Sequence, residues 1–164
     1  GQQIGLDGAQ RVAFFLDGGV GLIGRPLAAQ VADAVAMTRR VAEALDYVGV
    51  LAVEFFQHRG ELLANEFAPR VHNSGHWTIE GAETSQFENH LRAILGLPLG
   101  STRPRGHYAM VNLIGAVPEP ARMLAIPGTH LHHYGKTARP GRKVGHITVA
   151  CAAPGVLPPE LLAL

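Results

Sequence analysis

Two apolar runs separated by a short polar stretch are the feature that most constrains the fold of this chain. The runs cover residues 47–57 and 62–68, and His58-Arg59-Gly60-Glu61 lies between them. This pattern is typical of a β-hairpin, in which Gly60 takes the positive φ of a three-residue loop over residues 59–61. The sequence therefore predicts an antiparallel hairpin with a defined strand register.

Two glutamates face each other in this register. Partner numbers sum to about 120 in such a pair, which places Glu54 opposite Glu66. Carboxylates about 5 Å apart on neighbouring strands repel each other, and apolar residues surround both of these. A cation offsets this cost, and oxygen-only ligands suit a hard ion such as Mg²⁺. In the alternative register, Arg59 and Gly60 alone form the turn, Asn65 faces Glu54 and one glutamate points to solvent.

A polar loop follows the second strand. Residues 68–76 read APRVHNSGH, so the chain leaves the strand through a proline and then carries Arg, His, Asn, Ser and His within a few positions. Arg70 can bind a phosphate group through two parallel hydrogen bonds, while Asn73, Ser74 and the backbone around Gly75 add neutral donors. We therefore expect a metal, its carboxylates and an anion-binding loop to converge at one end of the hairpin.

Composition narrows the class of protein. The 164 residues are 47% hydrophobic, which suits a core in one domain or slightly more. The net charge of +1 gives no reason to expect nucleic acid or an anionic membrane as a partner. Cys151 is the only cysteine, so an internal disulfide is excluded and a reducing, cytoplasmic compartment fits. We expect no signal peptide and no membrane span, since no apolar run approaches roughly 20 residues.

The remainder of the first hundred residues predicts short strands and two helices. Asp-Gly-Gly is a turn signal between apolar stretches at residues 12–16 and 20–23. A proline opens a helical apolar pattern over residues 26–47. Residues 77–81 are expected to form a short strand or loop. A capping box begins a helix at Ser85, and Gly96 ends it.

Short strands separated by turns predict a small β-rich module in the last third of the chain. A linker rich in Gly, Pro and Arg over residues 99–105 precedes it. Strand candidates cover residues 108–115, 130–134 and 143–150, and a short element covers residues 122–126.

Several long motifs closely resemble those of one enzyme family. They are VGVLAVEFF, then NEFAPRVHNSGHWTIEGAETSQFENHLRAILGLPLG, MVNLIG and YGKTARPGRKVGHITV. The chain resembles the ATP-grasp enzymes of purine biosynthesis that carboxylate aminoimidazole ribonucleotide, the N5-carboxyaminoimidazole ribonucleotide synthetases. The resemblance runs from about Asp46 to Val149, some two thirds of the chain.

The resemblance implies an α+β fold and a ligase. Residues 1–104 are expected to form the C-terminal part of an ATP-grasp domain, an antiparallel sheet with helices, and residues 105–164 a small β-rich domain. We expect the C-terminal part of a longer enzyme that uses ATP and Mg²⁺. Its substrates are then bicarbonate and aminoimidazole ribonucleotide, its product is N5-carboxyaminoimidazole ribonucleotide, and its assembly is a homodimer.

The resemblance also assigns roles to individual residues. The metal carboxylates match Glu54 and Glu66, which together with Asn65 contact the nucleotide. The catalytic residues match Arg70, for phosphate or carboxyphosphate, and His72, for orienting the amine or transferring its proton. The substrate-binding residues match Arg70, His72, Asn73, Ser74, Lys136 and Arg142. Position 71 departs from the family, because valine stands where proline is expected.

Three alternatives remain. The chain can be a non-catalytic fragment that only dimerises, or another ATP-grasp carboxylate–amine ligase that shares the metal hairpin but acts on a different substrate. A zinc site among the nine histidines is disfavoured, because there is no second cysteine and because His132 and His133 point to opposite faces of a strand.

Overall fold

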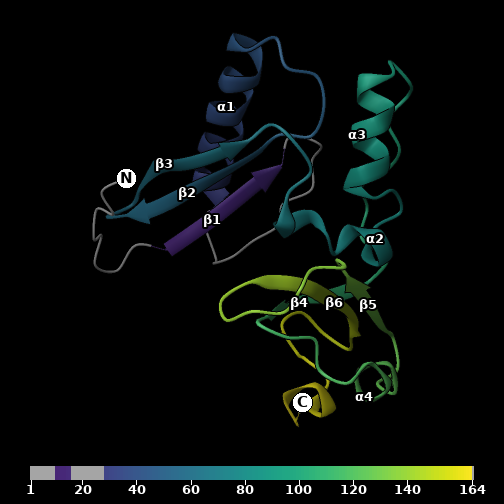
Figure 1. The fold of residues 1–164 in the computed structure, drawn as a ribbon. Helices are drawn as coiled ribbons and strands as arrows, with labels where there is room; N and C mark the ends of the chain where they lie inside the picture. The colour runs from purple at the N-terminus through teal and green to yellow at the C-terminus, as the bar shows by residue number, and fades with distance from the viewer. Residues whose placement is uncertain (1–9, 16–27, 164) are drawn as a thin grey trace. The chain divides into compact units, whose positions relative to one another are not determined.

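The computed structural model describes residues 10–15 and 28–163, which form two compact units. The first unit contains residues up to His76 together with Thr84–Arg103, and the second contains Trp77–Glu83 and Pro104–Leu164. Each has an antiparallel sheet and helices (Figure 1), which confirms the predicted α+β class. Residues 77–83 thus group with the second unit, and the division into domains 1–104 and 105–164 stays a prediction.

The sheet of the first unit has three antiparallel strands. They are β1 (Gln10–Phe15), β2 (Ala52–His58) and β3 (Glu61–Ala68), with β2 in the middle. Helix α1 (Ala28–Ala44) contacts all three strands and lies across one face of the sheet (Figure 1). The predicted first strand and first helix are confirmed, whereas the predicted turn and strand over residues 17–23 lie outside the described residues.

A hydrophobic core separates α1 from the sheet. Val53 and Phe55 of β2 are buried together with Ala34 of α1. Because successive side chains of a strand point to opposite faces, Glu54 lies on the face of the sheet that α1 does not cover. The core therefore positions the first of the two predicted metal carboxylates.

The β2–β3 hairpin has a tighter turn than the sequence predicted. His58 pairs with Glu61, so Arg59 and Gly60 alone form the turn, and their φ angles are 49° and 85°. Positive φ at both central residues is the geometry of the two-residue turns whose twist matches that of a hairpin. The predicted three-residue loop over residues 59–61 is therefore wrong.

A β-bulge nevertheless produces the predicted glutamate pair. Phe55 pairs with Ala64, but Glu54 pairs with Glu66, so Asn65 is an extra residue in β3. One extra residue reverses the alternation of side chains on the strand that follows it. Glu66 therefore shares a face with Glu54, whereas in a regular strand it would share the face of Ala64. The predicted pairing is confirmed, although a bulge and not a longer loop creates it.

Residues 77–81, predicted to be a short strand or loop, form the helical turn α2 (Thr78–Gly81). The N–H of Gly81 donates to the carbonyl of Trp77 at 2.9 Å and closes the turn. A Cβ on Gly81 would lie 2.6 Å from the ring of Trp77, so only glycine fits. This close packing overrides the strand preference of the β-branched residues Thr78 and Ile79, because strand propensity is a weak and context-dependent signal.

The loop after the hairpin contains a 3₁₀ turn, η1 (Asn73–Gly75), and the helix α3 (Gln86–Ile94) follows α2. Ser85 precedes α3, and its Oγ accepts a hydrogen bond from the N–H of Glu88 at 3.2 Å. This contact satisfies one of the N–H groups left without an intrahelical partner at the start of a helix. The predicted helix and its N-cap are confirmed.

The second unit is built on β4 (His107–Ile114), β5 (Thr129–His133) and β6 (Lys143–Cys151), with β6 between the other two. Each strand lies within two residues of its predicted bounds. Two short helical elements complete the unit, α4 (Pro120–Leu124) and η2 (Pro159–Ala163).

Strand β6 is the most buried strand of the second unit. Its residues 144–149 are buried, and Val144 and Ile147 pack with Leu113 and Met123. A central strand that is buried along its length fixes the side chains of both neighbouring strands in place. None of the helices in the described residues combines the length and apolar character that a membrane crossing requires.

Candidate metal and anion site

Two carboxylates and one imidazole converge beside the β2–β3 hairpin. A carboxylate oxygen of Glu54, one of Glu66 and a ring nitrogen of His72 all lie within 4.8 Å of one another. His72 Nε2 is 3.5 Å from Glu54 Oε1. His72 is buried and Glu54 half-buried, whereas Glu66 is exposed. We call these three residues the carboxylate–imidazole cluster, which is open to solvent on the side of Glu66.

The imidazole is held through its second nitrogen. His72 Nδ1 lies 2.7 Å from the hydroxyl of Ser74 and accepts a longer hydrogen bond, of 3.4 Å, from the Ser74 N–H. In the other tautomer, Nδ1 carries the proton and donates a hydrogen bond to the Ser74 hydroxyl instead, which leaves the Nε2 lone pair directed at the cluster. Histidines that bind metals commonly donate their other N–H in this way.

Gln86, at the first position of α3, holds the loop that carries His72. Its Oε1 accepts from the N–H of His72 at 3.0 Å, and its Nε2 donates to the His72 carbonyl at 2.8 Å. Nε2 also lies 2.7 Å from Nδ1 of His76. Gln86 is 2% exposed, so water does not compete for these bonds. Gly75 permits the approach, because a Cβ there would lie 2.5 Å from Gln86 Oε1.

The other predicted residues of the first unit differ in their relation to the cluster. Asn65, the bulge residue, donates from Nδ2 to Oε2 of Glu54 at 3.3 Å. Arg70 is exposed, and its Nη1 donates to the carbonyl of Val71 at 3.0 Å, a contact within its own loop. The structure thus brings Asn65 to the cluster, while the described contact of Arg70 points elsewhere. The two remaining predicted residues of the loop, Asn73 and Ser74, lie in η1.

The basic loop between β5 and β6 lies in the second unit. Arg142 Nη1 donates to a backbone carbonyl of this loop at 3.4 Å. The Nζ atoms of Lys136 and Lys143 are 5.3 and 5.5 Å from the centre of the Tyr134 ring. Burial, and after it the charge of Lys136, lowers the pKa of Lys143 to about 8. The substrate-binding role that the resemblance gives to Lys136 and Arg142 together with Arg70 stays a prediction, since Arg70 belongs to the first unit.

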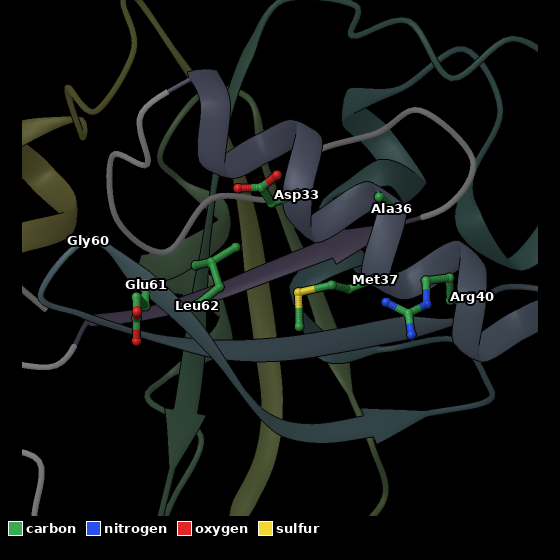
Figure 2. Close-up of a pocket in the computed structure, with 7 residues that line it drawn as sticks. All are labelled: Asp33, Ala36, Met37, Arg40, Gly60, Glu61 and Leu62. Atoms are coloured by element: carbon green, nitrogen blue, oxygen red, sulfur yellow. The ribbon is translucent and has the colours of Figure 1, made fainter.

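A separate pocket of about 510 Å³ lies between α1 and the hairpin turn. Figure 2 shows its lining, with Met37 reaching from α1 toward the strands and Leu62 from β3 toward the helix. Both side chains pack against the hydrophobic core. The pocket is on the side of the sheet that faces α1, so it is separate from the carboxylate–imidazole cluster. The lining residues are Asp33, Ala36, Met37, Arg40, Gly60, Glu61 and Leu62.

The donor set of the carboxylate–imidazole cluster fits a divalent cation. Two facing carboxylates supply hard oxygen ligands of the kind that Mg²⁺ takes, and the imidazole nitrogen suits first-row transition metals as well. A cation between Glu54 and Glu66 also removes the repulsion that cross-strand pairing imposes on two like charges. The arrangement can therefore bind a metal ion that in turn contacts a phosphate group.

Gln86 is the residue of the site that sequence reasoning missed. The capping box draws attention to Ser85 and Glu88, and the sequence alone presents Gln86 only as the first residue of a helix. Its partner His72 is 14 positions away, so no local pattern connects the two. The sequence does contain one indication of this contact. A glycine in the preceding loop lets the side chain of a glutamine at the start of the helix come close to the loop backbone.

Two family models match the chain in succession. That of the ATP-grasp domain matches residues 24–87, which contain the carboxylate–imidazole cluster. That of the phosphoribosylaminoimidazole carboxylase C-terminal domain matches residues 109–154, which contain the basic loop. The two polar regions thus fall in two different matched segments.

Comparison with individual proteins gives consistent results. The N5-carboxyaminoimidazole ribonucleotide synthase of Pseudomonas aeruginosa is 64% identical over 129 residues, which are 79% of this chain and 35% of the relative. The crystal structure of N5-carboxyaminoimidazole ribonucleotide synthetase from Thermus thermophilus aligns with a TM-score of 0.75 and 54% identity, over 88% of this chain and 46% of the other.

A third similar protein has bound ligands. It is the N5-carboxyaminoimidazole synthase of Aspergillus clavatus, in complex with ADP and 5-aminoimidazole ribonucleotide. It aligns with a TM-score of 0.69 and 35% identity, over 92% of this chain and 40% of the other. The chain spans about a third of the length of the curated relatives that it matches.

Proposed function

Because the chain belongs to the N5-carboxyaminoimidazole ribonucleotide synthase family, we propose that it supplies the metal and substrate-phosphate part of such an active site. The reaction uses ATP and bicarbonate to carboxylate 5-aminoimidazole ribonucleotide, and yields N5-carboxyaminoimidazole ribonucleotide, ADP and phosphate. The observation that carries this proposal is the convergence of Glu54, Glu66 and His72 within the segment that matches the ATP-grasp domain. The ligands of the Aspergillus clavatus relative support the same substrates.

In this proposal Glu54 and Glu66 hold Mg²⁺. The ion would neutralise charge on the transferring phosphoryl group, which is the main requirement of phosphoryl transfer. Asn65 donates to Glu54, and we assign it to the metal shell and the nucleotide. The bulge matters for this role because it places both carboxylates on one face of the sheet.

His72 and Arg70 form the substrate side of the proposed site. The amine of the ribonucleotide must lose a proton when its nitrogen bonds to the carboxyl carbon, and a neutral imidazole nitrogen can accept that proton. Ser74 contacts the ring of His72 and Gln86 holds its backbone, and such positioning favours this role. Arg70 is assigned to phosphate or carboxyphosphate, and Asn73 and Ser74 add donors from the same loop.

The second unit is assigned to the phosphate of the ribonucleotide. Lys136 and Arg142 lie in a loop whose lysines and arginines offer several cations, and phosphate monoesters bind well to such clusters. The family relationship also favours a homodimer that works in the cytoplasm, and both remain part of the proposal.

Calorimetric titration of the chain with Mg²⁺–ADP and with 5-aminoimidazole ribonucleotide tests the proposal. In the double variant Glu54→Gln/Glu66→Gln, we expect affinity for Mg²⁺–ADP to fall by more than about tenfold, because both metal carboxylates are lost. Arg70→Ala should weaken binding of the ribonucleotide alone. Glu61→Gln is the matched control, since Glu61 is an exposed glutamate of the same hairpin outside the cluster.

The outcomes separate the three candidate functions. Binding of both ligands, lost in the variants but not in the control, supports the synthase. Binding of Mg²⁺–ADP without any binding of the ribonucleotide favours another ATP-grasp carboxylate–amine ligase. A folded chain that binds neither ligand favours a role in assembly only, and contradicts the proposed function of this chain.

A further inference from the structure

The second unit contains a row of four polar side chains to which the proposed function gives no role. The row consists of Glu80 in α2, His132 in β5, His146 in β6 and Tyr134, which follows β5 directly. Glu80 Oε1 lies 2.8 Å from His132 Nε2. The Tyr134 hydroxyl lies 2.6 Å from His146 Nδ1. We call these residues the polar row.

Strand pairing produces the centre of the polar row. His132 and His146 are direct partners on antiparallel strands, so their side chains leave the same face of the sheet side by side. Their rings stack with centroids 4.4 Å apart and planes 13° from parallel. His146 is 1% exposed and lies in the central strand. The middle of the row is therefore fixed by the backbone of the sheet.

At one end of the polar row, the Tyr134 ring lies near Lys136 and Lys143. Hydrogen bonding to His146 limits rotation of the Tyr134 ring, and the ammonium groups of both lysines lie within 5.5 Å of the centre of this ring. An aromatic face attracts a cation within about 6 Å of its centre. The ring therefore attracts both Lys136 and Lys143 although their charges repel, and an anion that contacts both ammonium groups would relieve the repulsion.

The charge of Lys136 affects the protonation of Lys143. The pKa of Lys143 is lowered to about 8, first by burial and second by the charge of Lys136. The two ammonium groups therefore interact electrostatically, and an anion that contacts both would be favoured. Holding them in place beforehand removes part of the side-chain entropy that binding would otherwise cost.

We propose that the polar row positions Lys136 and Lys143 so that both bind one phosphate monoester, and that the Tyr134 ring holds the two lysines in place. The residues of the row act through the lysines and need not touch the ligand. This inference rests on the proposed function, in which Lys136 binds the substrate phosphate, and it adds Lys143 as the second cation. It also gives a role to the hydrogen bond between the Tyr134 hydroxyl and the buried His146.

Titration of the full chain with ribose 5-phosphate tests this proposed binding by the two lysines. Tyr134→Phe keeps the ring and removes the bond to His146, so we expect the dissociation constant to rise about threefold to tenfold. Tyr134→Leu also removes the aromatic face from two cations, and we expect a rise of more than about tenfold. Tyr47→Phe is the matched control, because it removes a tyrosine hydroxyl bonded to the Val50 carbonyl in the first unit.

A second readout distinguishes positioning from general stability. The pKa of Lys143, followed by NMR of its side chain, should rise in Tyr134→Leu as the lysines separate. Three results together support the inference: weaker binding of ribose 5-phosphate by both Tyr134 variants, a raised pKa of Lys143 in Tyr134→Leu, and an unchanged thermal midpoint in Tyr134→Phe. If both Tyr134 variants bind ribose 5-phosphate as the parent chain does, the polar row has no positioning role.

The remaining outcomes separate this inference from the proposed function. If Lys136→Gln and Arg142→Gln weaken binding but the Tyr134 variants do not, the inference fails and the proposed function stands. If the parent chain does not bind ribose 5-phosphate at all, the inference is overturned. Titration with Mg²⁺–ADP still tests the metal site of the first unit in that case.

Discussion

The two units form their polar clusters by opposite routes. In the first, Glu66 reaches the site only because a bulge in β3 interrupts regular pairing, and His72 comes from an irregular loop. In the second, His132 and His146 meet because they are direct partners in a regular pair of strands. A site that depends on irregular backbone is sensitive to the number of residues, whereas one that depends on regular pairing is sensitive to the identity of its side chains.

Insertion of one alanine between Asn65 and Glu66 should have the largest effect on this contrast. The second extra residue lets β3 pair regularly, with Asn65 opposite Glu54 and Glu66 opposite Ala52. Glu66 then lies about 7 Å further along the strand, so we expect Mn²⁺ affinity, measured by calorimetry, to fall by more than about tenfold. Binding of ribose 5-phosphate by the second unit should not change. Asn65→Ala is the control, because it keeps the residue count and removes only the contact with Glu54. Normal Mn²⁺ binding by the insertion variant would show that the bulge does not align the carboxylates.

Loss of the Gln86 side chain should have the next largest effect, a decrease in stability that is confined to the first unit. Gln86→Ala leaves the N–H and carbonyl of His72 without their side-chain partner, which we expect to lower the free energy of unfolding by about 2–4 kcal/mol. Urea unfolding followed by circular dichroism measures this loss through α1 and α3.

Two controls define the limits of the Gln86 prediction. Gln57→Ala removes a glutamine with one hydrogen bond in the same unit, to Gln30, and should cost only about 1 kcal/mol. Trp77, the only tryptophan, lies in the second unit, so its fluorescence should report an unchanged transition there. A Gln86→Ala variant as stable as Gln57→Ala would contradict the role given to Gln86.

A smaller effect is expected at the start of α3. Ser85→Ala removes the hydroxyl that accepts from the Glu88 N–H, and we expect a loss of about 1 kcal/mol in the free energy of unfolding. Ser85→Asp keeps an acceptor at the N-cap and should restore most of it. The comparison uses the same urea experiment, and equal stability of the alanine and aspartate variants would rule out a capping role.

The smallest expected effect is a dependence on pH of phosphate binding by the second unit. The pKa of Lys143 is about 8, so this lysine loses its charge as pH rises from 7 to 9. A phosphate monoester keeps its full charge in that range, since its second pKa is near 6. We therefore expect affinity for ribose 5-phosphate to fall about threefold as pH rises through 8. Lys143→Arg stays charged and should remove this dependence, whereas an unchanged slope in that variant would exclude Lys143 as its source.

Much of the fold could be predicted from the sequence, because its signals are local. Apolar runs separated by turn residues located β2, β3 and the strands β4, β5 and β6, and the capping box located the start of α3. The failures arose where backbone geometry depends on close contacts. Residues 77–81 are helical because Gly81 packs against the ring of Trp77, and a strand propensity cannot reveal such a contact.

The candidate site was predictable in part for a related reason. The pairing of Glu54 with Glu66 was correct although the turn was wrong, because the tight turn and the bulge each shift the register by one residue and cancel. Gln86 and the polar row were not predictable, since Glu80 and His132 are 52 positions apart. Polar contacts across such distances leave no periodicity in the sequence.

The bulge at Asn65 also bears on whether copies of this chain stick together. β3 is an edge strand of the described sheet, and on either side of the bulge it exposes Leu63, by 41%, and Phe67, by 52%. A straight apolar edge invites another chain to add a strand and begin an aggregate, and an interruption of its hydrogen-bonding ladder opposes this. The residue that aligns two carboxylates thus also acts as a gatekeeper against intermolecular β-sheet growth.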